Sequence, residues 1–216
     1  MLNRIIRKLT KLLGSYNKLL TYQGSVADTY LADRAATVKW HEEHIIFARH
    51  IRDLPDGLKV LDVPFGTGRF VPFYEFKGLE VTAMDISRDM LNIAEKYNRL
   101  ADSLTFCEGS ALDLPFERNE FELIVCSRFI GYIPTVEQAI QIFKEFHRVS
   151  RTFLYVGVQY LKDNEPIGPE DKLGHRYSRQ ELINLISDVG FRLVSNTLLE
   201  ARDNYQNEIL MLEKIK

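Results

Sequence analysis

Two acidic residues each stand at the end of a short apolar run, with a glycine turn between them. Asp62 lies in the run 58–63, Gly66 and Gly68 follow it, and Asp85 comes directly after the next apolar run, seventeen residues beyond Gly68. Glycines let a backbone approach a ligand and adopt positive φ, and a helix that starts after them offers N–H groups to a ligand. A carboxylate placed like Asp85 can accept hydrogen bonds from both hydroxyls of a ribose. The spacing therefore predicts a site for a ligand that contains a ribose.

The residues around the turn argue against a dinucleotide. Pro64 stands where the first glycine of a GxGxxG fingerprint would be, and nothing supplies the third glycine. Asp62 would place a negative charge beside a pyrophosphate, whereas a carboxylate at this position suits a cationic group such as an amine or a sulfonium. An NAD-dependent oxidoreductase is therefore the weaker alternative.

The elements that must carry these residues alternate between strands and helices. Apolar or β-branched runs predict strands at 58–63, 79–84, 103–107, 121–126, 152–158, 191–198 and 207–214. Helical spacing and capping signals predict helices at about 33–53, 68–75 and 88–100, from Pro134 onward, and from the capping box at Ser178 to Gly190. This order predicts an α/β fold: a doubly wound, Rossmann-like sheet of seven mostly parallel strands, with helices on both faces and an antiparallel C-terminal hairpin.

The first part of the chain differs in charge from the rest. Residues 1–27 contain five basic residues and no acid, although the whole chain of 216 residues has a formal net charge of −2. Within residues 1–20 the apolar side chains recur at steps of three and four, which predicts an amphipathic helix. We expect a helical arm or cap over 1–53 and a cofactor-binding domain over 58–216. The amphipathic helix packs on its own domain or on a partner subunit, or, as the alternative, lies on an anionic membrane.

Composition excludes several other classes of protein. Cys107 and Cys126 are the only cysteines, which excludes a disulfide framework and a cysteine-rich zinc site, and the histidines form no metal-ligand pattern. The near-neutral net charge makes nucleic acid an unlikely partner. No apolar run approaches the roughly 18 residues of a membrane span. We expect a cytoplasmic protein, with peripheral membrane contact as the alternative.

Five segments, in order along the chain, resemble the motifs of the class I S-adenosylmethionine-dependent methyltransferases, especially the small-molecule type 11 group. The resemblance covers roughly 58–196. The segments are the glycine-rich Val60–Gly68, the ribose motif Met84–Leu91, the adenine-side motif Glu108–Phe116, the fourth-strand segment Phe121–Tyr132, and the late helix and strand Tyr177–Phe191. The resemblance implies the doubly wound fold and S-adenosylmethionine as the cofactor.

The resemblance also implies a role for individual residues. The cofactor-binding set that it implies is Asp62, Pro64, Gly66 and Gly68 for the methionine part, Asp85 for the ribose, Ile86, Ser110 and Ala111 for the adenine, and Ser127. Two positions depart from the family pattern. Pro64 replaces a glycine and has no amide hydrogen to donate, and Ser110 replaces a common Asp, so that a hydroxyl would accept from the adenine amino group.

Methyl transfer from a sulfonium is an in-line displacement, so the protein mainly aligns the acceptor, the methyl group and the sulfur. The acceptor site should lie above the strand ends. Its candidate residues are Arg128, Tyr132, Tyr160 and Arg176 for the substrate, with His175 and Tyr22 as candidate catalytic groups. A base is needed only if the acceptor is a hydroxyl or a weakly acidic N–H group.

The sequence thus predicts a methyltransferase acting on oxygen or carbon of a small-molecule or lipid- or glycan-linked acceptor, without a metal. Two alternatives stay open. One is a subunit that keeps the fold but has lost catalysis, and the other is a nucleic-acid methyltransferase. A cofactor titration separates the enzyme from a protein that does not bind the cofactor at all.

Overall fold

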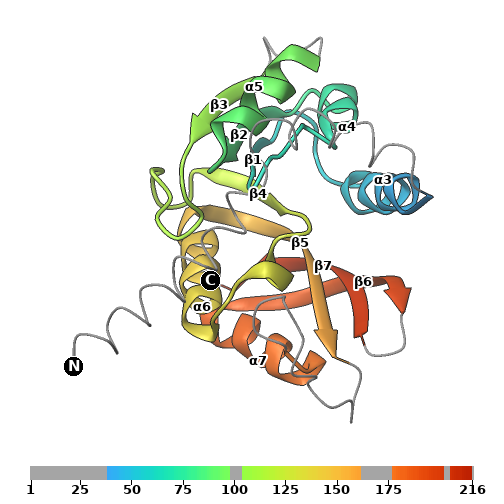
Figure 1. Cartoon of the computed structure of the whole chain (residues 1–216), viewed down its shortest axis with the longest axis vertical. Coiled ribbons are helices and arrows are strands. Elements are labelled where there is room, and N and C mark those ends of the chain that lie inside the picture. Colours follow the sequence, from blue (N-terminus) through green and yellow to red (C-terminus); the bar gives the residue numbers. More distant parts are fainter. Residues whose placement is uncertain (1–37, 98–103, 162–176, 202–204, 216) are drawn as a thin grey trace, which may run out of the picture.

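A computed structural model describes residues 38–97, 104–161, 177–201 and 205–215. Its centre is one seven-stranded sheet in the order β3-β2-β1-β4-β5-β7-β6 (Figure 1). The strands are β1 (Lys59–Asp62), β2 (Glu80–Asp85), β3 (Leu104–Glu108), β4 (Phe121–Cys126), β5 (Ser150–Leu161), β6 (Phe191–Ala201) and β7 (Tyr205–Lys214). The predicted seven-stranded Rossmann-like fold is confirmed.

Strand directions place the functional end of the sheet. Strands β1 to β5 pair in parallel, whereas β7 pairs antiparallel with both β5 and β6. The carboxyl ends of β1 to β5 therefore meet at one edge, and β1 lies between β2 and β4 at the point where the strand order reverses. Ligands of open α/β sheets bind outside the strand ends at such a switch point.

The helices are α3 (Val38–Ile51), α4 (Val71–Phe76), α5 (Arg88–Tyr97), α6 (Val136–Val149) and α7 (Arg179–Val189), with a short 3-10 helix, η2, at Ile130–Tyr132. The predicted capping box at Ser178 is confirmed, and Gly190 ends α7 in the left-handed conformation at φ 105°. One prediction was wrong in detail. Helix α6 begins after Thr135, whose hydroxyl accepts the N–H of Gln138, so Pro134 precedes the helix instead of opening it.

The helices cover the two faces of the sheet as separate groups. Helices α3, α4 and α5 share one buried cluster with one face, in which Phe47 stacks on Phe70 at 4.0 Å and meets Tyr155 of β5 edge-on. Helices α6 and α7 share the other cluster, and Figure 1 shows these two helices lying together, away from α3. Burial on both faces explains why β1, β4 and the middle of β5 are almost continuously apolar.

No helix among the described residues is long and apolar enough to cross a membrane. The predicted amphipathic segment 1–20 lies outside the described residues, and so does the first part of the predicted helix 33–53. The division of the chain at residues 53 and 58 stays a prediction, with α3 sharing the core of the sheet.

Candidate functional site

The turn after β1 approaches the end of β2 closely. Gly66 and Gly68 both have positive φ, 59° and 80°, which explains why glycines occupy these positions. The Phe65 N–H donates to the Met84 carbonyl oxygen at 2.8 Å, which ties the turn to β2, and the Val63–Pro64 peptide bond is cis. A side chain at Gly66 would meet the methyl group of Met90. The turn therefore lies packed against the end of β2, with Gly66 half-buried and Gly68 buried.

Asp85 joins the turn after β1 to the turn after β2. Its two carboxylate oxygens accept the N–H groups of Gly66 and Ser87, each at 2.8 Å. The side chain is buried, and burial raises the pKa of its carboxyl group, while the hydrogen bonds from the backbone amides of Ser87, Gly66 and Ile86 lower it. Asp85 thus organises both loops, and a ligand hydroxyl would share a carboxylate that already accepts backbone amides.

Asp62 is a second buried carboxylate at the adjacent strand end. The Tyr74 hydroxyl donates a hydrogen bond to the Asp62 carboxylate at 2.7 Å, and Asp62 is 3% exposed. Burial raises the pKa of Asp62 well above its ordinary value, and the hydrogen bond from Tyr74 lowers it while the negative charge of Asp85 raises it further. Asp62 has no ion-pair partner among the described residues. A ligand cation beside Asp62 would supply the missing opposite charge.

The predicted adenine side lies after β3. The Ser110 hydroxyl accepts the Leu112 N–H at 3.2 Å, and Ala111 is buried in the core cluster beneath the loop. Ile86 is half-buried at the end of β2. A side chain at Gly109 would lie 2.4 Å from the methyl group of Met84, so the Met84 side chain would have to shift to make room for it. Ser110 therefore serves the local turn, and its use by a ligand stays a prediction.

An ion triad links α3 to the loops after β1 and β4. Glu43, 1% exposed, lies between Arg69 and Arg128, whose side chains are 10% and 22% exposed. The Arg128 Nε donates to both Glu43 oxygens, at 2.8 and 3.0 Å, and the Arg69 guanidinium lies over the Trp40 ring at 4.2 Å. Arg128 holds this geometry at φ 55°, a left-handed backbone that is unusual for a side chain other than glycine.

A cavity of about 260 Å³ opens beside this triad, over β5 and β7. Its lining includes Glu43, Ser127, Arg128, Tyr132, Gln159, Tyr205 and Asn207. The Gln159 Nε2 donates to the Asn207 Oδ1 at 3.2 Å, and the Ser127 hydroxyl is buried with no hydrogen-bond partner in the described residues. Gly131 and Gly157 let the chain after β4 lie close to β5. The cavity is small, and much of its lining is polar.

The predicted substrate residues have different positions. Arg128 and Tyr132 line the cavity, and Tyr132 is 44% exposed. Tyr160 does not line it. Its hydroxyl donates to the Gln206 Oε1 at 3.0 Å, and burial, with the charge of Glu208, raises its pKa to about 12. Tyr160 instead belongs to the core cluster shared with α6 and α7.

Three candidates, Tyr22, His175 and Arg176, lie outside the described residues, so the predicted catalytic groups and this substrate contact stay predictions. Within the part of the chain that the structure describes, no group of three or more His, Cys, Asp or Glu could hold a metal ion.

The sequence analysis missed four residues that shape this end of the sheet: Glu43, Arg69, Gln159 and Asn207. Arg69 follows the glycine turn directly, so its place beside the site could have been inferred. Glu43 lies 85 residues from Arg128 on a helix rich in charged residues, and its pairing has no local signal. Gln159 and Asn207 meet only because β7 pairs with β5.

Comparison with known proteins agrees with this architecture. Residues 60–152 match a family model described as a methyltransferase domain, which spans β1 to β4, α6 and the start of β5. A demethylmenaquinone methyltransferase of Staphylococcus epidermidis is 28% identical over 123 residues, 54% of this chain. That stretch is 50% of the relative, so the chain matches about half the length of this protein.

Solved structures share the fold. The cyclase SpnF superposes with a TM-score of 0.69 at 15% identity, over 80% of each chain. A phosphoethanolamine N-methyltransferase of Haemonchus contortus in complex with S-adenosyl-L-methionine superposes with a TM-score of 0.68 at 14% identity, over 81% of this chain and 52% of that one. The strand order and the match of residues 60–152 together support a class I S-adenosylmethionine-dependent methyltransferase domain.

Proposed function

We propose that this protein transfers the methyl group of S-adenosylmethionine to a small polar acceptor. The observation that carries the proposal is the pair of buried carboxylates, Asp62 and Asp85, at the ends of adjacent parallel strands on either side of a turn whose two glycines have positive φ. The cofactor combines a cationic methionine part with a ribose, which are the two groups that such carboxylates bind. The solved relative from Haemonchus contortus holds this cofactor on the same fold.

The residues of the site fit the cofactor by charge and by space. Asp62 carries a carboxylate whose negative charge burial disfavours, and a cation beside it offsets that cost. The glycine turn would take the methionine part, and Asp85 would hold the ribose hydroxyls through lone pairs that the amides of Gly66 and Ser87 leave. Ile86 and the loop at Ser110 would border the adenine. The bound cofactor supplies the reactive methyl group.

The cavity beside the ion triad supports a small polar acceptor over a lipid-linked one. It measures about 260 Å³, and Gln159, Asn207 and Arg128 supply hydrogen-bonding groups to it. A long alkyl chain would leave such groups without partners, which costs free energy. Arg128 would orient an acidic or carbonyl oxygen of the acceptor.

The relatives that act on quinones give a narrower candidate. The demethylmenaquinone methyltransferase carries a quinone acceptor in its name, and a carbonyl-bearing ring fits the polar lining of the cavity. However, the family match ends at residue 152, before the part of β5 and all of β7 that line the cavity. The relatives therefore support the proposed cofactor of this chain more strongly than they support a quinone acceptor.

Calorimetric titration with S-adenosylmethionine, S-adenosylhomocysteine and NAD tests the cofactor part. We expect both sulfur-containing ligands to bind wild-type protein and NAD not to bind. Asp85→Ala should weaken both interactions, while Glu80→Ala at the opposite end of β2 should leave them unchanged. Failure of wild-type protein to bind S-adenosylmethionine would contradict the proposal.

Turnover needs its own test, because the fold alone does not determine the reaction: SpnF has this fold and is named a cyclase. Methyl-labelled S-adenosylmethionine, incubated with a panel of hydroxylated aromatic, quinol and carboxylic acid acceptors, should give labelled product with a small polar acceptor. Cofactor binding with no transfer to any acceptor would favour the alternative of a binding or assembly subunit.

A further inference from the structure

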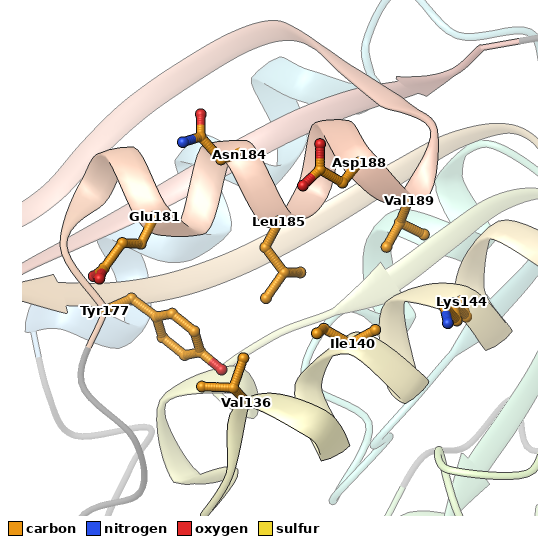
Figure 2. Close-up of a pocket in the computed structure, with 9 residues that line it drawn as sticks. All are labelled: Val136, Ile140, Lys144, Tyr177, Glu181, Asn184, Leu185, Asp188 and Val189. Atoms are coloured by element: carbon orange, nitrogen blue, oxygen red, sulfur yellow. The ribbon is translucent and has the colours of Figure 1, made fainter.

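An apolar groove of about 390 Å³ lies between α6 and α7, on the face of the sheet opposite α3. Figure 2 shows Leu185 and Val189 of α7 pointing toward Val136 and Ile140 of α6, with Tyr177 at one end. Val136, Ile140 and Val189 are half-buried, so their remaining surface faces the groove. Such a floor between two helices has the form that binds the apolar face of a third helix.

The two walls of the groove differ in charge. Glu181 and Asp188 stand on α7, seven residues apart, so they lie on the same side of that helix and about 10 Å from each other. Lys144 stands on the α6 wall. Burial raises the pKa of Tyr177 to about 12, and the negative charges of Glu137 on α6 and Glu181 on α7 add to this shift. The α7 wall therefore carries two acids, whereas the α6 wall carries Lys144 and has Glu137 near its Tyr177 end.

The segment 1–20 has matching asymmetry on an ideal helix. Its apolar stripe comprises Leu2, Ile5, Ile6, Leu9, Leu12, Leu13, Tyr16, Leu19 and Leu20. Beyond one border of that stripe lie basic residues, in the order Lys8, Arg4 and Lys11, while Lys18 and Arg7 lie nearly opposite the stripe. Along the other border, uncharged polar residues recur at steps of seven: Asn3, Thr10 and Asn17. Arg4 and Lys11 are seven residues apart and so match the spacing of the two acids on α7, and the neutral border suits the wall that carries Lys144.

We propose that residues 1–20 bind as an amphipathic helix in the groove between α6 and α7 of the same chain, with Arg4 and Lys11 facing Glu181 and Asp188. The connecting residues, 21–37, can extend over about 60 Å. A domain of this size has a radius of gyration of about 17 Å, so the connection can pass from α3 around the sheet. The other long segment outside the described residues, 162–176, has four acids and three bases and does not complement an acidic wall.

Site-directed cross-linking tests the contact in the full chain. The variant Cys107→Ser leaves only the buried Cys126, and Lys11→Cys with Asp188→Cys then adds one thiol on each partner. A short bismaleimide should join these two positions in high yield. The matched control pairs Lys11→Cys with Glu95→Cys on α5, on the opposite face of the sheet, and should give no cross-link. An equal yield in both pairs would contradict the proposal.

Mixing isotopically labelled and unlabelled chains before cross-linking separates this contact from one between copies. We expect cross-linked peptides of uniform label. Peptides that join a labelled segment to an unlabelled groove would overturn the proposal in favour of an exchange between two copies.

Hydrogen exchange of residues 2–20 gives a second measurement. The double variant Asn184→Lys and Asp188→Lys changes two exposed residues of α7 and should speed exchange several-fold. The two lysines would repel the basic residues of segment 1–20, whereas in the wild type Asp188 attracts them and Asn184 is neutral. Adding Arg4→Glu and Lys11→Glu should restore slow exchange, and Glu95→Lys alone should change nothing. Glu181 is left intact because it belongs to the capping box of α7. Slow exchange that appears only with phosphatidylglycerol vesicles would show a membrane-binding segment and would overturn the proposal.

Discussion

The proposed ligand-binding edge has a cofactor side and an acceptor side, and these two sides are built by different means. On the cofactor side, the turns after β1 and β2 are joined by backbone amides that converge on Asp85, and the residues involved lie within one short stretch of chain. On the acceptor side, Glu43 of α3 holds Arg128 of the loop after β4, and side chains of β5 and β7 complete the lining. Short-range backbone geometry forms the first side, and long-range side-chain packing forms the second.

This difference predicts that substitutions on one side leave the other side functional. The acceptor side should carry the larger share of tertiary stability, because its charges are buried and paired across distant segments. On the cofactor side, the carboxylates are buried without a cation in the absence of ligand. They should therefore lower the free energy of unfolding of the free protein and raise its affinity for the cofactor.

The largest effect is expected for Glu43→Gln. The change leaves Arg69 and Arg128 buried without their shared counter-ion, which should lower the free energy of unfolding by about 3 kcal/mol. The affinity for S-adenosylmethionine should change much less, because the Gly66 and Ser87 amides are held by Asp85 and not by Glu43, which reaches the loop after β1 only at Arg69. Urea unfolding and calorimetry measure the two quantities, with the exposed neighbour Glu42→Gln as the control. If the free energy of cofactor binding fell as much as the free energy of unfolding, the two sides would not be independent.

Asp85→Ala should weaken S-adenosylmethionine binding about 100-fold, which corresponds to about 2.7 kcal/mol. The substitution removes the ribose acceptor and also leaves the N–H groups of Gly66 and Ser87 without their partner. Asp85→Asn separates these causes, since its single carbonyl oxygen keeps one of the two amide contacts. If Asp85→Asn binds as tightly as wild type, the carboxylate charge has no role in binding.

Asp62→Asn should move stability and binding in opposite directions. Without ligand, the neutral amide removes a buried charge, keeps an acceptor for the Tyr74 hydroxyl, and should raise the free energy of unfolding at pH 7 by on the order of 1 kcal/mol. Affinity for the cationic cofactor should fall about tenfold. A variant that is less stable than wild type would show that Asp62 serves the fold more than the ligand.

The pH dependence of the same variant has a defined sign. Because the folded-state pKa of Asp62 is raised, its contribution to stability is fully present below the pKa of the unfolded chain and is lost as the pH rises through the folded-state pKa. The stability advantage of Asp62→Asn should therefore be absent near pH 3, grow with rising pH and then level off. Cofactor affinity of the wild type should rise over the same interval. Thermal melts and calorimetry at several pH values would measure both trends.

The smallest effect is expected for Gly157→Ala, on the acceptor side. The added methyl group would lie 3.3 Å from the Arg128 backbone nitrogen and 3.4 Å from the Ile209 side chain. We expect a loss of stability of about 1 kcal/mol, a lower rate of methyl transfer and unchanged cofactor affinity. Gly78→Ala, at a positive φ of 60° in an open turn, is a control for the general cost of replacing glycine. If Gly157→Ala lost cofactor affinity and Gly78→Ala did not, the acceptor side would affect cofactor binding.

The sequence predicts the residues of the cofactor side better than those of the acceptor side. Asp62, Gly66, Gly68 and Asp85 are recognisable because each belongs to a strand-turn-helix unit whose geometry is local. The position of Tyr160 shows the limit of such reasoning. It lies near the loop expected to carry the acceptor, but alternation along β5 turns its side chain to the face covered by α6 and α7, while Gln159 faces the cavity.

The sequence by itself therefore determined the fold class, the order of its elements and the glycine turn after β1, because apolar periodicity, glycine and capping residues act over a few positions. Only the tertiary structure decided the Glu43 ion triad, the Gln159–Asn207 contact and the groove between α6 and α7. Each of these joins residues far apart in the chain. Their partners depend on which strands pair and which helix faces meet, and burial then makes those pairings energetically strong.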